Sequence, residues 1–598
     1  MDMNTLNFIL NDVHGLEEIL QKERFADYDK EAIDLFLQGI KDYADKDLYP
    51  VFREVDEDPA RFEDGKIYTH PAVKTVMQKA GEMGIIGALF DNEDGGLQMP
   101  LTVVEAASYI MSSANNHLTG YPGLTAGAAD LIVTFGSQEL KDKYVPNMIA
   151  GEWGGTMCLT EPQAGSSLSD AVTSASPQED GSFKIKGQKI FISGGDHEHA
   201  SNFVHLVLAR IEGAPAGTKG ISLFVVPKKR INDDGSMESN DVITAGDYQK
   251  MGQRGYCTTH LVFGENDDCQ GWLVGQPHNG LRYMFQMMNG ARIAVGRDGA
   301  AVATAAYYAS LQYANERPQG RRLSNGGKKD LSQGQTLIIN HPDVRRMLLL
   351  QKAVSEASLS LVLQGCKYFD LEDTSEGEEK ERNNLLLEML TPIIKTYPSE
   401  MGRISVNNGL QVLGGYGFCS EFVLQQYARD IRIMAIYEGT TGIQSQDLLG
   451  RKVTMKGGEG LRLLAGEMME TIKSAMTYDD LRPAAGVLGE KLQQAQKVIE
   501  HLMAYAMKGN YERYLSDATI FMEMFGTIVI GWQWLKMGVQ AKQALVTGKT
   551  EYPASFYEGK LHTMKFFYKY EMPRTNSLAE ILMNEETLTI VEEKELIS

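Results

Sequence analysis

One turn in the sequence could place a carboxylate for proton transfer, at Ile436–Gln446 (IYEGTTGIQSQ). Thr441 and Gln444 have the spacing of a capping box, which predicts that a helix begins near Gly442. Glu438 would then lie in an apolar-flanked turn just before that helix. Desolvation in such a turn would raise the pKa of its carboxyl towards the range of a general base. A solvated surface glutamate fits the same residues, and the sequence alone leaves both interpretations open.

Two further segments could hold a ligand through backbone and hydroxyl groups. In Met157–Ser167 (MCLTEPQAGSS), proline and glycine break regular structure beside several hydroxyls, which suits a polar ligand or a phosphate-bearing cofactor. In Gln411–Gly417 (QVLGGYG), three glycines within four residues permit close backbone approach. The first segment equally fits a turn between strands, and the second a helix C-cap. Neither the context nor the spacing matches the dinucleotide fingerprint, so a Rossmann site is excluded.

The metal-ligating residue types do not form a convincing site. His197-Glu198-His199 places two histidines only two residues apart in a Gly/Asp-flanked loop without a third ligand, so we predict a solvated turn and no metal. The cysteines are odd in number, form no C-x-x-C pair and indicate a reducing compartment without disulfides or zinc. They are Cys158, Cys257, Cys269, Cys366 and Cys419.

These segments must be positioned by elements whose type changes along the chain. Apolar periodicity predicts helices at Pro71–Met83, Val103–Met111 and Gln138–Ile149, the last broken at Pro146. Strands are predicted at Phe183–Ser193, Phe203–Ala209, Ile221–Pro227 and Cys257–Phe263. Helices return at Ala291–Asn315, from Pro342, at Leu385–Val412 with a kink or interruption at Pro392 and Pro398, and at Leu461–Ala475, Leu488–Met507 and Ala518–Leu545.

This order predicts a mainly α protein with a middle β domain. We expect an N-terminal helical domain over residues 1–153, a small antiparallel β domain over 154–278, a helical domain over 279–455 and an additional helical extension over 456–598. The 598 residues suffice for several cores. Lys and Arg number 58 and Asp and Glu 79, so the formal net charge of −21 opposes non-specific nucleic-acid binding. An acidic N-terminus and the absence of a 20-residue apolar run predict a cytoplasmic chain without a transmembrane segment.

Taken together and in order, the segments resemble the acyl-CoA dehydrogenase family. CLTEPQAGS is similar to its flavin-contacting loop, KIFISG to the flavin strand that follows, and QVLGGYG with Arg429-Asp430 to its Q-x-x-G-G-x-G … R-D segment. YEGTTGIQ is similar to the catalytic turn, and KMGQRGYCT and NGARIAVG also have counterparts. The similarity covers roughly residues 70–455 and implies an N-terminal helical domain, a middle β domain and a C-terminal four-helix bundle.

The resemblance implies FAD-dependent α,β-dehydrogenation of an acyl-CoA thioester to the trans-2-enoyl-CoA. Glu438 would remove the α-proton while the β-hydride passes to FAD. The Glu438 backbone N–H and a flavin ribityl hydroxyl would stabilise charge on the thioester carbonyl. Electrons would leave to an electron-transfer flavoprotein. Because FAD of this family also touches a neighbouring subunit, a homodimer or homotetramer is implied.

The resemblance also assigns binding residues. The flavin ring would contact Met157, Leu159, Thr160, Phe191 and Ser193, and Gly165 and Ser166 would line the cofactor and CoA side of the loop. Arg317 and Gln319 would reach the FAD of an adjoining subunit. Its adenosine end would be held by Gln411, Gly414 and Gly415, and its phosphates would lie near Thr440 and Gly442. Substrate would contact Ser166, Asn289, Arg292 and Gly439.

Several positions depart from the family pattern. Phe191 stands where Trp is frequent, Ser167 replaces the usual Asp, and Gly442 replaces a commoner Gln or Asn. The R-x-x-F-G pattern is shortened to Arg317-Pro-Gln-Gly320 and followed by a polar insertion, which weakens the expected subunit-bridging contact.

The extension after Met455 resembles long-form bacterial members that act on fatty acyl-CoAs or 3-methylthiopropanoyl-CoA. We expect it to pack against the core or between subunits, with Phe566–Tyr570 (FFYKY) in the interior. An acyl-CoA oxidase with the same base and fold is the alternative function. A DNA-associated relative is a weaker alternative, because the extension is not basic. The acyl group cannot be read from the sequence.

Overall fold

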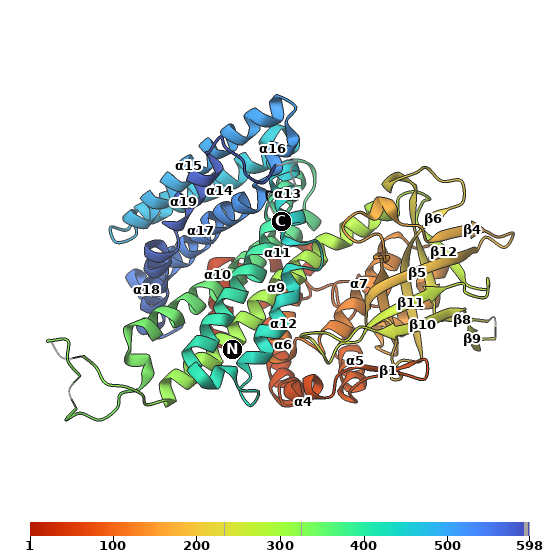
Figure 1. The fold of residues 1–598 in the computed structure, drawn as a ribbon, viewed down its shortest axis with the longest axis horizontal. Coiled ribbons are helices and arrows are strands. Elements are labelled where there is room, and N and C mark those ends of the chain that lie inside the picture. The colour runs from red at the N-terminus through yellow and green to blue at the C-terminus, as the bar shows by residue number, and fades with distance from the viewer. Residues whose placement is uncertain (233, 324–325, 330, 591–595, 597–598) are drawn as a thin grey trace. The chain divides into compact units, whose positions relative to one another are not determined.

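The computed structural model describes residues 1–232, 234–323, 326–329, 331–590 and 596, without the side chains of residues 285–288, and forms two compact units. Residues 27–291 form one unit, and residues 1–26 together with 292–598 form the other. Helix α9 (Gly280–Glu316) runs from the first unit into the second. Figure 1 labels the elements.

The unit of residues 27–291 combines helices with one large sheet. Its longer helices, which include the three predicted there, are α3 (Lys30–Tyr43), α4 (Phe52–Glu57), α5 (Ala72–Glu82), α6 (Leu101–Asn115), α7 (Gly120–Phe135) and α8 (Gln138–Ile149). The predicted break at Pro146 is wrong, because α8 continues through it to Ile149. Tyr144, Val145 and Met148 are buried around that proline, and this packing outweighs the loss of one backbone N–H donor.

The sheet has eight strands, seven of them in the order β10-β11-β5-β12-β7-β6-β3, with β4 pairing with both β5 and β6. Most pairs are antiparallel, while β3 and β4 each run parallel to β6. All four predicted strands are present, as β5, β6, β7 and β11. The strands are β3 (Trp153–Cys158), β4 (Ser174–Pro177), β5 (Phe183–Ser193), β6 (Asn202–Ile211), β7 (Ile221–Pro227), β10 (Val242–Asp247), β11 (Thr258–Phe263) and β12 (Gln270–Val274). Short hairpins pair β1 (Arg61–Glu63) with β2 (Lys66–Tyr68) and β8 (Lys229–Ile231) with β9 (Met237–Ser239).

Helix α7 packs closely on strand β3 and thereby fixes the start of the loop after it. A Cβ atom at Gly155 would lie 2.8 Å from the Ala128 Cβ and 3.1 Å from the Thr125 Cα, so only glycine permits this approach. The Thr125 hydroxyl also accepts a hydrogen bond from the Gly155 N–H at 3.1 Å. The segment after Cys158 therefore leaves the sheet from a rigid base.

The second unit is helical. Besides α9 it contains α1 (Met3–Asn7), α2 (Leu16–Leu20), α10 (Pro342–Asp373), α11 (Gly377–Leu413), α12 (Leu424–Asp430), α13 (Thr441–Asp447), α14 (Glu459–Met476), α15 (Arg482–Met507), α16 (Tyr511–Leu515), α17 (Ala518–Thr547), α18 (Ala554–Tyr570) and α19 (Arg574–Leu582). Helix α11 runs through Pro392 and Pro398 without interruption. Both prolines are buried among apolar neighbours, which offsets the loss of two N–H donors. The predicted fold class, mainly helical with a middle β part, is confirmed.

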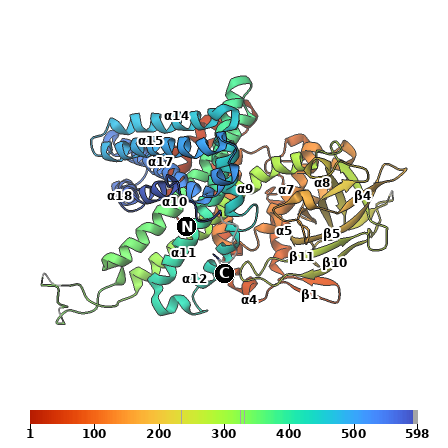
Figure 2. The same ribbon diagram turned by 45° about the horizontal axis from the view of Figure 1, so that its top comes forward.

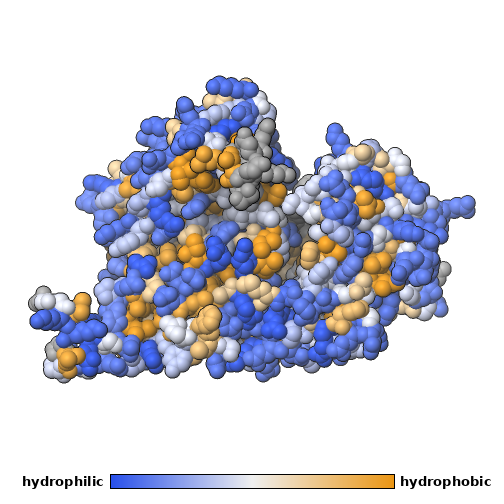
Figure 3. Space-filling view, viewed as in Figure 1, coloured by the Kyte–Doolittle hydropathy of each residue, from blue (hydrophilic) through white to orange (hydrophobic). Residues whose placement is uncertain are grey.

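The extension forms its own layer of helices, with α14, α15, α17 and α18 side by side (Figures 1 and 2). Helix α17 is long and apolar enough to cross a membrane, but 78% of its most apolar 18-residue window is buried inside the protein. It is the core helix of the extension, with Trp532 and Trp534 almost inaccessible. Phe566, Phe567 and Tyr568 are also buried, as predicted, whereas Tyr570 at the end of that stretch is 48% exposed. The face seen in Figure 3 is largely hydrophilic, with scattered hydrophobic groups.

The N-terminal segment packs on the helices of this second unit. Lys560 on α18, only 1% exposed, donates a hydrogen bond to the Thr5 hydroxyl at 2.9 Å. The His14 ring and the Ser360 hydroxyl on α10 are 3.0 Å apart, and Ser360 donates to Gln533 on α17 at 2.7 Å. The unit is therefore assembled from both ends of the described chain.

Candidate active site

The turn that carries Glu438 has an unusual backbone. Glu438 has φ +53°, in the left-handed region that non-glycine residues rarely occupy, and Gly439 follows with φ +83°. The Gln444 side-chain amide donates to the Glu438 carbonyl at 2.9 Å. Glycine is favoured at position 439 because side chains rarely adopt this φ and because a Cβ there would lie 2.8 Å from that amide nitrogen. Such strain persists only where neighbouring groups fix the backbone, and it is frequent at functional sites.

The helix after the turn begins one residue earlier than predicted. Helix α13 starts at Thr441, and its N-cap is Thr440, whose hydroxyl accepts from the Ile443 N–H at 3.2 Å. The predicted capping box is therefore wrong, because Gln444 reaches back to the Glu438 carbonyl instead of the cap. Thr441 donates to the Glu400 carboxylate on α11 at 2.6 Å.

A lysine on α11 lies directly behind the turn. The Lys395 Nζ donates to the Gly439 carbonyl at 2.8 Å, and its side chain is inaccessible to solvent. Burial lowers the pKa of Lys395 to about 8, although the charges of Glu438 and Glu400 raise it and that of Arg292 lowers it further. Sequence reasoning missed Lys395. Its signal is a lone charged residue in an apolar helical run, TPIIKTY.

Arg292 of the predicted substrate set lies on α9 and is 8% exposed. It pairs with Asp447 on α13 at 3.2 Å, so α9 is tied to the helix that follows the turn with Glu438. Asn289, one turn earlier on α9, is partly buried.

The environment of Glu438 favours a base with a perturbed pKa. Burial raises the pKa of its carboxyl above the ordinary value, while the positive charges of Arg292 and Lys395 lower it. Desolvation is the largest of these effects. The carboxylate is therefore a stronger proton acceptor than a solvated glutamate but still has two cations that stabilise its charged form.

The loop after β3 is held by a buried ion pair. Lys189 on β5 and Glu161 in the loop are 0% and 1% exposed, and the Nζ–Oε1 distance is 2.8 Å. Lys189 also donates to the Leu159 carbonyl at 3.0 Å, and Glu161 accepts from the Val172 and Thr173 N–H groups. Burial alone would raise the pKa of Glu161, but Lys189 and these hydrogen bonds lower it to about 2. Sequence reasoning did not assign this pair, although Lys189 interrupts the inward-facing positions of the strand.

The residues predicted to contact the flavin ring surround the end of that loop. The Thr160 carbonyl accepts from the Ile190 N–H at 2.9 Å, which joins the loop to β5. Phe191 has φ +58° and is 57% exposed, and its ring lies 4.6 Å from that of Tyr248. Met157, Leu159, Thr160 and Ser193 are each partly exposed, and Gly165 and Ser166 are exposed. An exposed aromatic ring beside hydroxyls and an open glycine fits a flat, polar-edged group such as FAD.

The glycine segment after α11 serves partly as a helix end. Gly414 is the C-cap with φ +62°, and a Cβ at Gly414 or Gly415 would meet no atom within 4 Å. A Cβ at Gly417, in contrast, would lie 2.3 Å from the Leu410 carbonyl oxygen. The first two glycines are therefore open to a ligand, whereas the third is required by packing.

Three other predicted FAD residues lie at the surface of this unit. Gln411 and Gln319 are exposed, and the Arg317 guanidinium lies 5.3 Å from the Tyr416 ring centre. Arg317 is thus brought beside the glycine segment despite the shortened motif. Gly442 is partly buried in the first turn of α13, where a Cβ would lie no closer than 3.7 Å to another atom.

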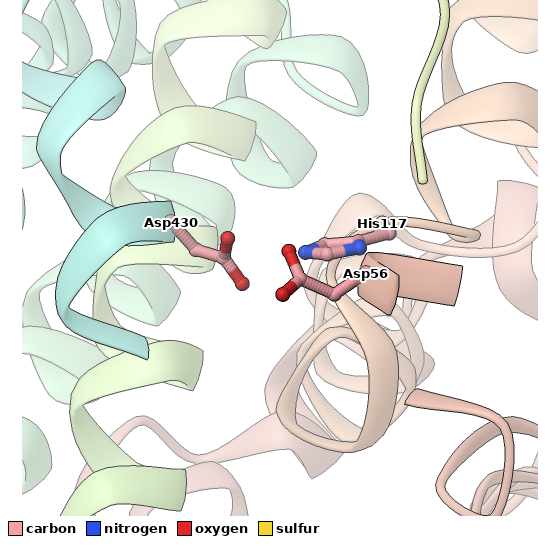
Figure 4. Close-up of side chains that lie close together, drawn as sticks. All are labelled: Asp56, His117 and Asp430. Carbon is pink, nitrogen blue, oxygen red and sulfur yellow. The ribbon is translucent and has the colours of Figure 1, made fainter. Parts of the chain in front are cut away.

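The segment KMGQRGYCT is fixed within residues 27–291 by two aromatic side chains. The Tyr121 hydroxyl accepts from the Cys257 N–H at 3.0 Å and donates to the Gly255 carbonyl at 3.2 Å. The Gly255 N–H donates to His117 Nδ1 at 3.4 Å. Asp56 lies beside the His117 ring, and one of its carboxylate oxygens is within 4.8 Å of a ring nitrogen (Figure 4).

The loop with His197 and His199 is not a solvated turn as predicted. His197 is 4% exposed, and its ring packs edge-on against Tyr121 at 5.4 Å and Phe203 at 4.9 Å. Burial lowers the pKa of His197 to about 3. The sequence signal for solvation, the flanking Gly and Asp residues, was misleading because Asp196 is itself buried and paired with Lys228 at 2.5 Å.

Family models cover most of the chain. They match the acyl-CoA dehydrogenase N-terminal domain at residues 30–152, the middle domain at 156–265, the C-terminal domain at 328–452 and the "Acetyl-CoA dehydrogenase C-terminal like" domain at 464–591. The last match covers most of the extension, so this part too has counterparts in relatives.

Curated relatives and solved structures agree. The 3-methylmercaptopropionyl-CoA dehydrogenase of Ruegeria pomeroyi is 37% identical, over 86% of this chain and 85% of its own. The broad-specificity linear acyl-CoA dehydrogenase FadE5 of Mycobacterium tuberculosis is 33% identical, over 96% of each chain. The fold is similar to Caenorhabditis elegans ACDH-11 in complex with C11-CoA (TM-score 0.76, 17% identity, 97% of this chain and 96% of that one). It is also similar to the FAD-complexed acyl-CoA dehydrogenase of Bacillus anthracis (TM-score 0.75, 21% identity, 97% and 92%). The chain therefore belongs to the acyl-CoA dehydrogenase family of FAD-dependent oxidoreductases, which act on CH–CH bonds.

Proposed function

We propose that this protein dehydrogenates an acyl-CoA thioester to the trans-2-enoyl-CoA, with Glu438 as the base that removes the α-proton. The observation that supports this most strongly is the conformation and environment of Glu438. Its backbone is strained at φ +53°, its carbonyl is held by Gln444, and burial raises the pKa of its carboxyl. When bound, FAD supplies the acceptor for the hydride that leaves the β-carbon.

The residues of the chain have separate roles in this proposal. The Glu438 carboxylate takes the α-proton, and its backbone N–H donates to the thioester carbonyl to stabilise developing negative charge. Gly439 borders the substrate, and Arg292, Asn289 and Ser166 belong to the CoA side.

The cofactor would be held by two groups of residues. Its ring would contact Met157, Leu159, Thr160, Phe191 and Ser193, with Gly165 and Ser166 on the loop beside it. The remainder would contact Gln411, Gly414, Gly415, Thr440 and Gly442, with Arg317 and Gln319 reaching the FAD of a neighbouring subunit.

We further propose a cytoplasmic homodimer or homotetramer that delivers electrons to an electron-transfer flavoprotein. The division into domains at residues 1–153, 154–278, 279–455 and 456–598 belongs to the same proposal. The names of the relatives, which include a butyryl-CoA dehydrogenase of Syntrophomonas wolfei, suggest the acyl groups to try first, namely 3-methylmercaptopropionyl, butyryl and other linear acyl groups.

To test this, the purified yellow protein is titrated with these acyl-CoAs under anaerobic conditions, and the flavin absorbance is measured after each addition. Wild-type protein should bleach, and Glu438→Gln should keep its FAD but lose turnover by roughly 10²–10⁴-fold, since an amide cannot accept the proton. Exposed Glu512 offers a matched control, and Glu512→Gln should remain active. If the flavin of the Glu438→Gln variant bleached as fully and as fast as that of wild-type protein, the assignment of the base would be contradicted.

A second measurement separates the dehydrogenase from the oxidase. Under air, the proposed enzyme should reduce an electron-accepting dye much faster than it releases peroxide. Peroxide release at the rate of substrate consumption would instead assign an acyl-CoA oxidase.

A further inference from the structure

The burial of Lys395 is unfavourable for the folding free energy. It lies in the middle of α11, is 0% exposed and is flanked by the buried Ile394 and Thr396. A buried ammonium costs free energy that an apolar side chain of similar size would not, and such replacements are often neutral or stabilising. A role in stability alone therefore does not explain a cation here.

The contact that Lys395 makes is with the catalytic turn itself. Its Nζ donates to the Gly439 carbonyl at 2.8 Å, directly after the strained residue, while Gln444 donates to the Glu438 carbonyl at 2.9 Å. Two consecutive carbonyls of the turn are thus fixed, one from α11 and one from α13. Two such contacts restrict rotation of the peptide between Glu438 and Gly439, which a left-handed glutamate requires.

The charges around Lys395 and Glu438 come from three helices. Lys395 and Glu400 lie on α11, Arg292 lies on α9, and Asp447 on α13 pairs with Arg292 at 3.2 Å. Lys395 and Arg292 both favour the ionised form of the Glu438 carboxyl, against the effect of burial. Arg292 already has a carboxylate partner, whereas the hydrogen bond of Lys395 goes to a neutral carbonyl.

We propose that Lys395 is a positioning residue for the dehydrogenation: it fixes the Gly439 carbonyl so that Glu438 keeps its strained conformation, and its charge holds Glu438 ready as a carboxylate. The inference rests on the proposed function of Glu438 and adds to it a residue that acts through the turn. Lys395 touches neither substrate nor cofactor in this proposal.

The experiment compares Lys395→Met and Lys395→Arg with wild-type protein, using steady-state kinetics from pH 5.5 to pH 9 with an acyl-CoA that wild-type protein oxidises. Lys395→Met should lower kcat/KM by roughly 10- to 100-fold, the range for a displaced catalytic group, mostly through kcat. Without the Lys395 charge the pKa of Glu438 rises, so the acidic limb of the kcat/KM profile should move to higher pH. Lys395→Arg restores the charge and should return that limb towards wild type.

Lys560 provides the matched control. It is 1% exposed, lies in the same unit and pairs with Glu356 at 2.9 Å, away from the catalytic turn. Lys560→Met should leave the acidic limb where it is in wild type. An acidic limb for Lys395→Met that coincides with wild type, or a kcat/KM within twofold of it, would overturn the proposal.

Glu438→Gln distinguishes failure of this inference from failure of the proposed function. If Glu438→Gln is inactive while Lys395→Met behaves as wild type, only the role of Lys395 is refuted. If Glu438→Gln is active, the base itself is misassigned. FAD content and far-UV circular dichroism of every variant show whether a loss of activity reflects a lost fold.

Discussion

Two lysine–glutamate neighbourhoods in this protein, each with a fully buried lysine, have opposite character. In the β-containing unit, Lys189 contacts the Glu161 carboxylate directly at 2.8 Å. In the helical unit, Lys395 donates to the Gly439 carbonyl, and Glu438 experiences only its charge. The pKa of Glu161 is about 2, whereas that of Glu438 lies above its ordinary value.

The hydrogen-bond partners of the two carboxylates explain why one glutamate is structural and the other is a candidate base. Glu161 accepts hydrogen bonds from Lys189, Val172, Thr173 and Gln163, so its lone pairs are occupied and it stays ionised. Glu438 is desolvated, and among the described residues no direct ion pair or hydrogen bond to its carboxylate is found. Its carboxylate can therefore take a proton. The same residue types therefore give a structural brace in one unit and a candidate base in the other.

The largest effect on stability is expected from breaking the direct pair. Glu161→Gln leaves the Lys189 ammonium buried without its counter-charge, and the free energy of unfolding should fall by about 3–5 kcal/mol. Urea denaturation at pH 7 measures the loss. Exposed Glu179 in the same unit supplies a control, Glu179→Gln, which should differ from wild type by less than about 0.5 kcal/mol. Equal stability of the two variants would show that Glu161 is not a brace.

The corresponding change in the helical unit should have the opposite sign. The folded protein binds a proton at Lys395 with a pKa of about 8, below the ordinary value of 10.5. Its charge therefore opposes folding fully below pH 8, and the penalty disappears as the pH rises towards 10.5. Lys395→Met should raise the free energy of unfolding at pH 7 by about 1–3 kcal/mol. A clear loss of stability in urea denaturation would instead make Lys395 a structural brace like Lys189.

The smallest expected effect is a change in folding stability at acidic pH. The pKa of Glu161 is about 2 in the folded protein and has an ordinary value of 4.5. The stability it contributes is fully present above pH 4.5 and is lost as the pH falls through 2. Between pH 6 and pH 3.5, the stability difference between wild type and Glu161→Gln should shrink by about 1 kcal/mol. Urea denaturation at both pH values measures this difference in the free energy of unfolding. A difference that is the same at pH 6 and pH 3.5 would show that the pKa of Glu161 is not lowered in the folded protein.

The regular elements could be predicted because burial imposes a period on the sequence. Strands β5 and β7 have the bounds that alternation and β-branched residues predicted, and α17 follows its apolar run. The break predicted at Pro146 and the interruption allowed for at Pro392 and Pro398 are absent, because local rules do not include tertiary packing, which offsets the lost N–H groups. The fold class was accessible, and the path of single helices through proline was not.

For the site, the sequence indicated the segments but not their internal contacts. The turn with Glu438 was singled out by its glycine and its capping residues, yet the assignment of the cap was wrong by one residue. Lys395 lies 43 residues before Glu438 and belongs to helix α11, whereas Glu438 lies in a turn, so no local pattern joins the two. Contacts of this kind depend on the packing of α11 against the turn, which a single sequence does not display.

The packing of residues 1–26 within the helical unit has a consequence for how the protein is made. Thr5 contacts Lys560 across 555 positions, and His14 contacts Ser360 across 346. During translation the first segment leaves the ribosome long before these partners exist, while residues 27–291 can complete their own unit. The helical unit closes only after α18 has been synthesised, so until then its N-terminal apolar residues cannot be buried against that helix.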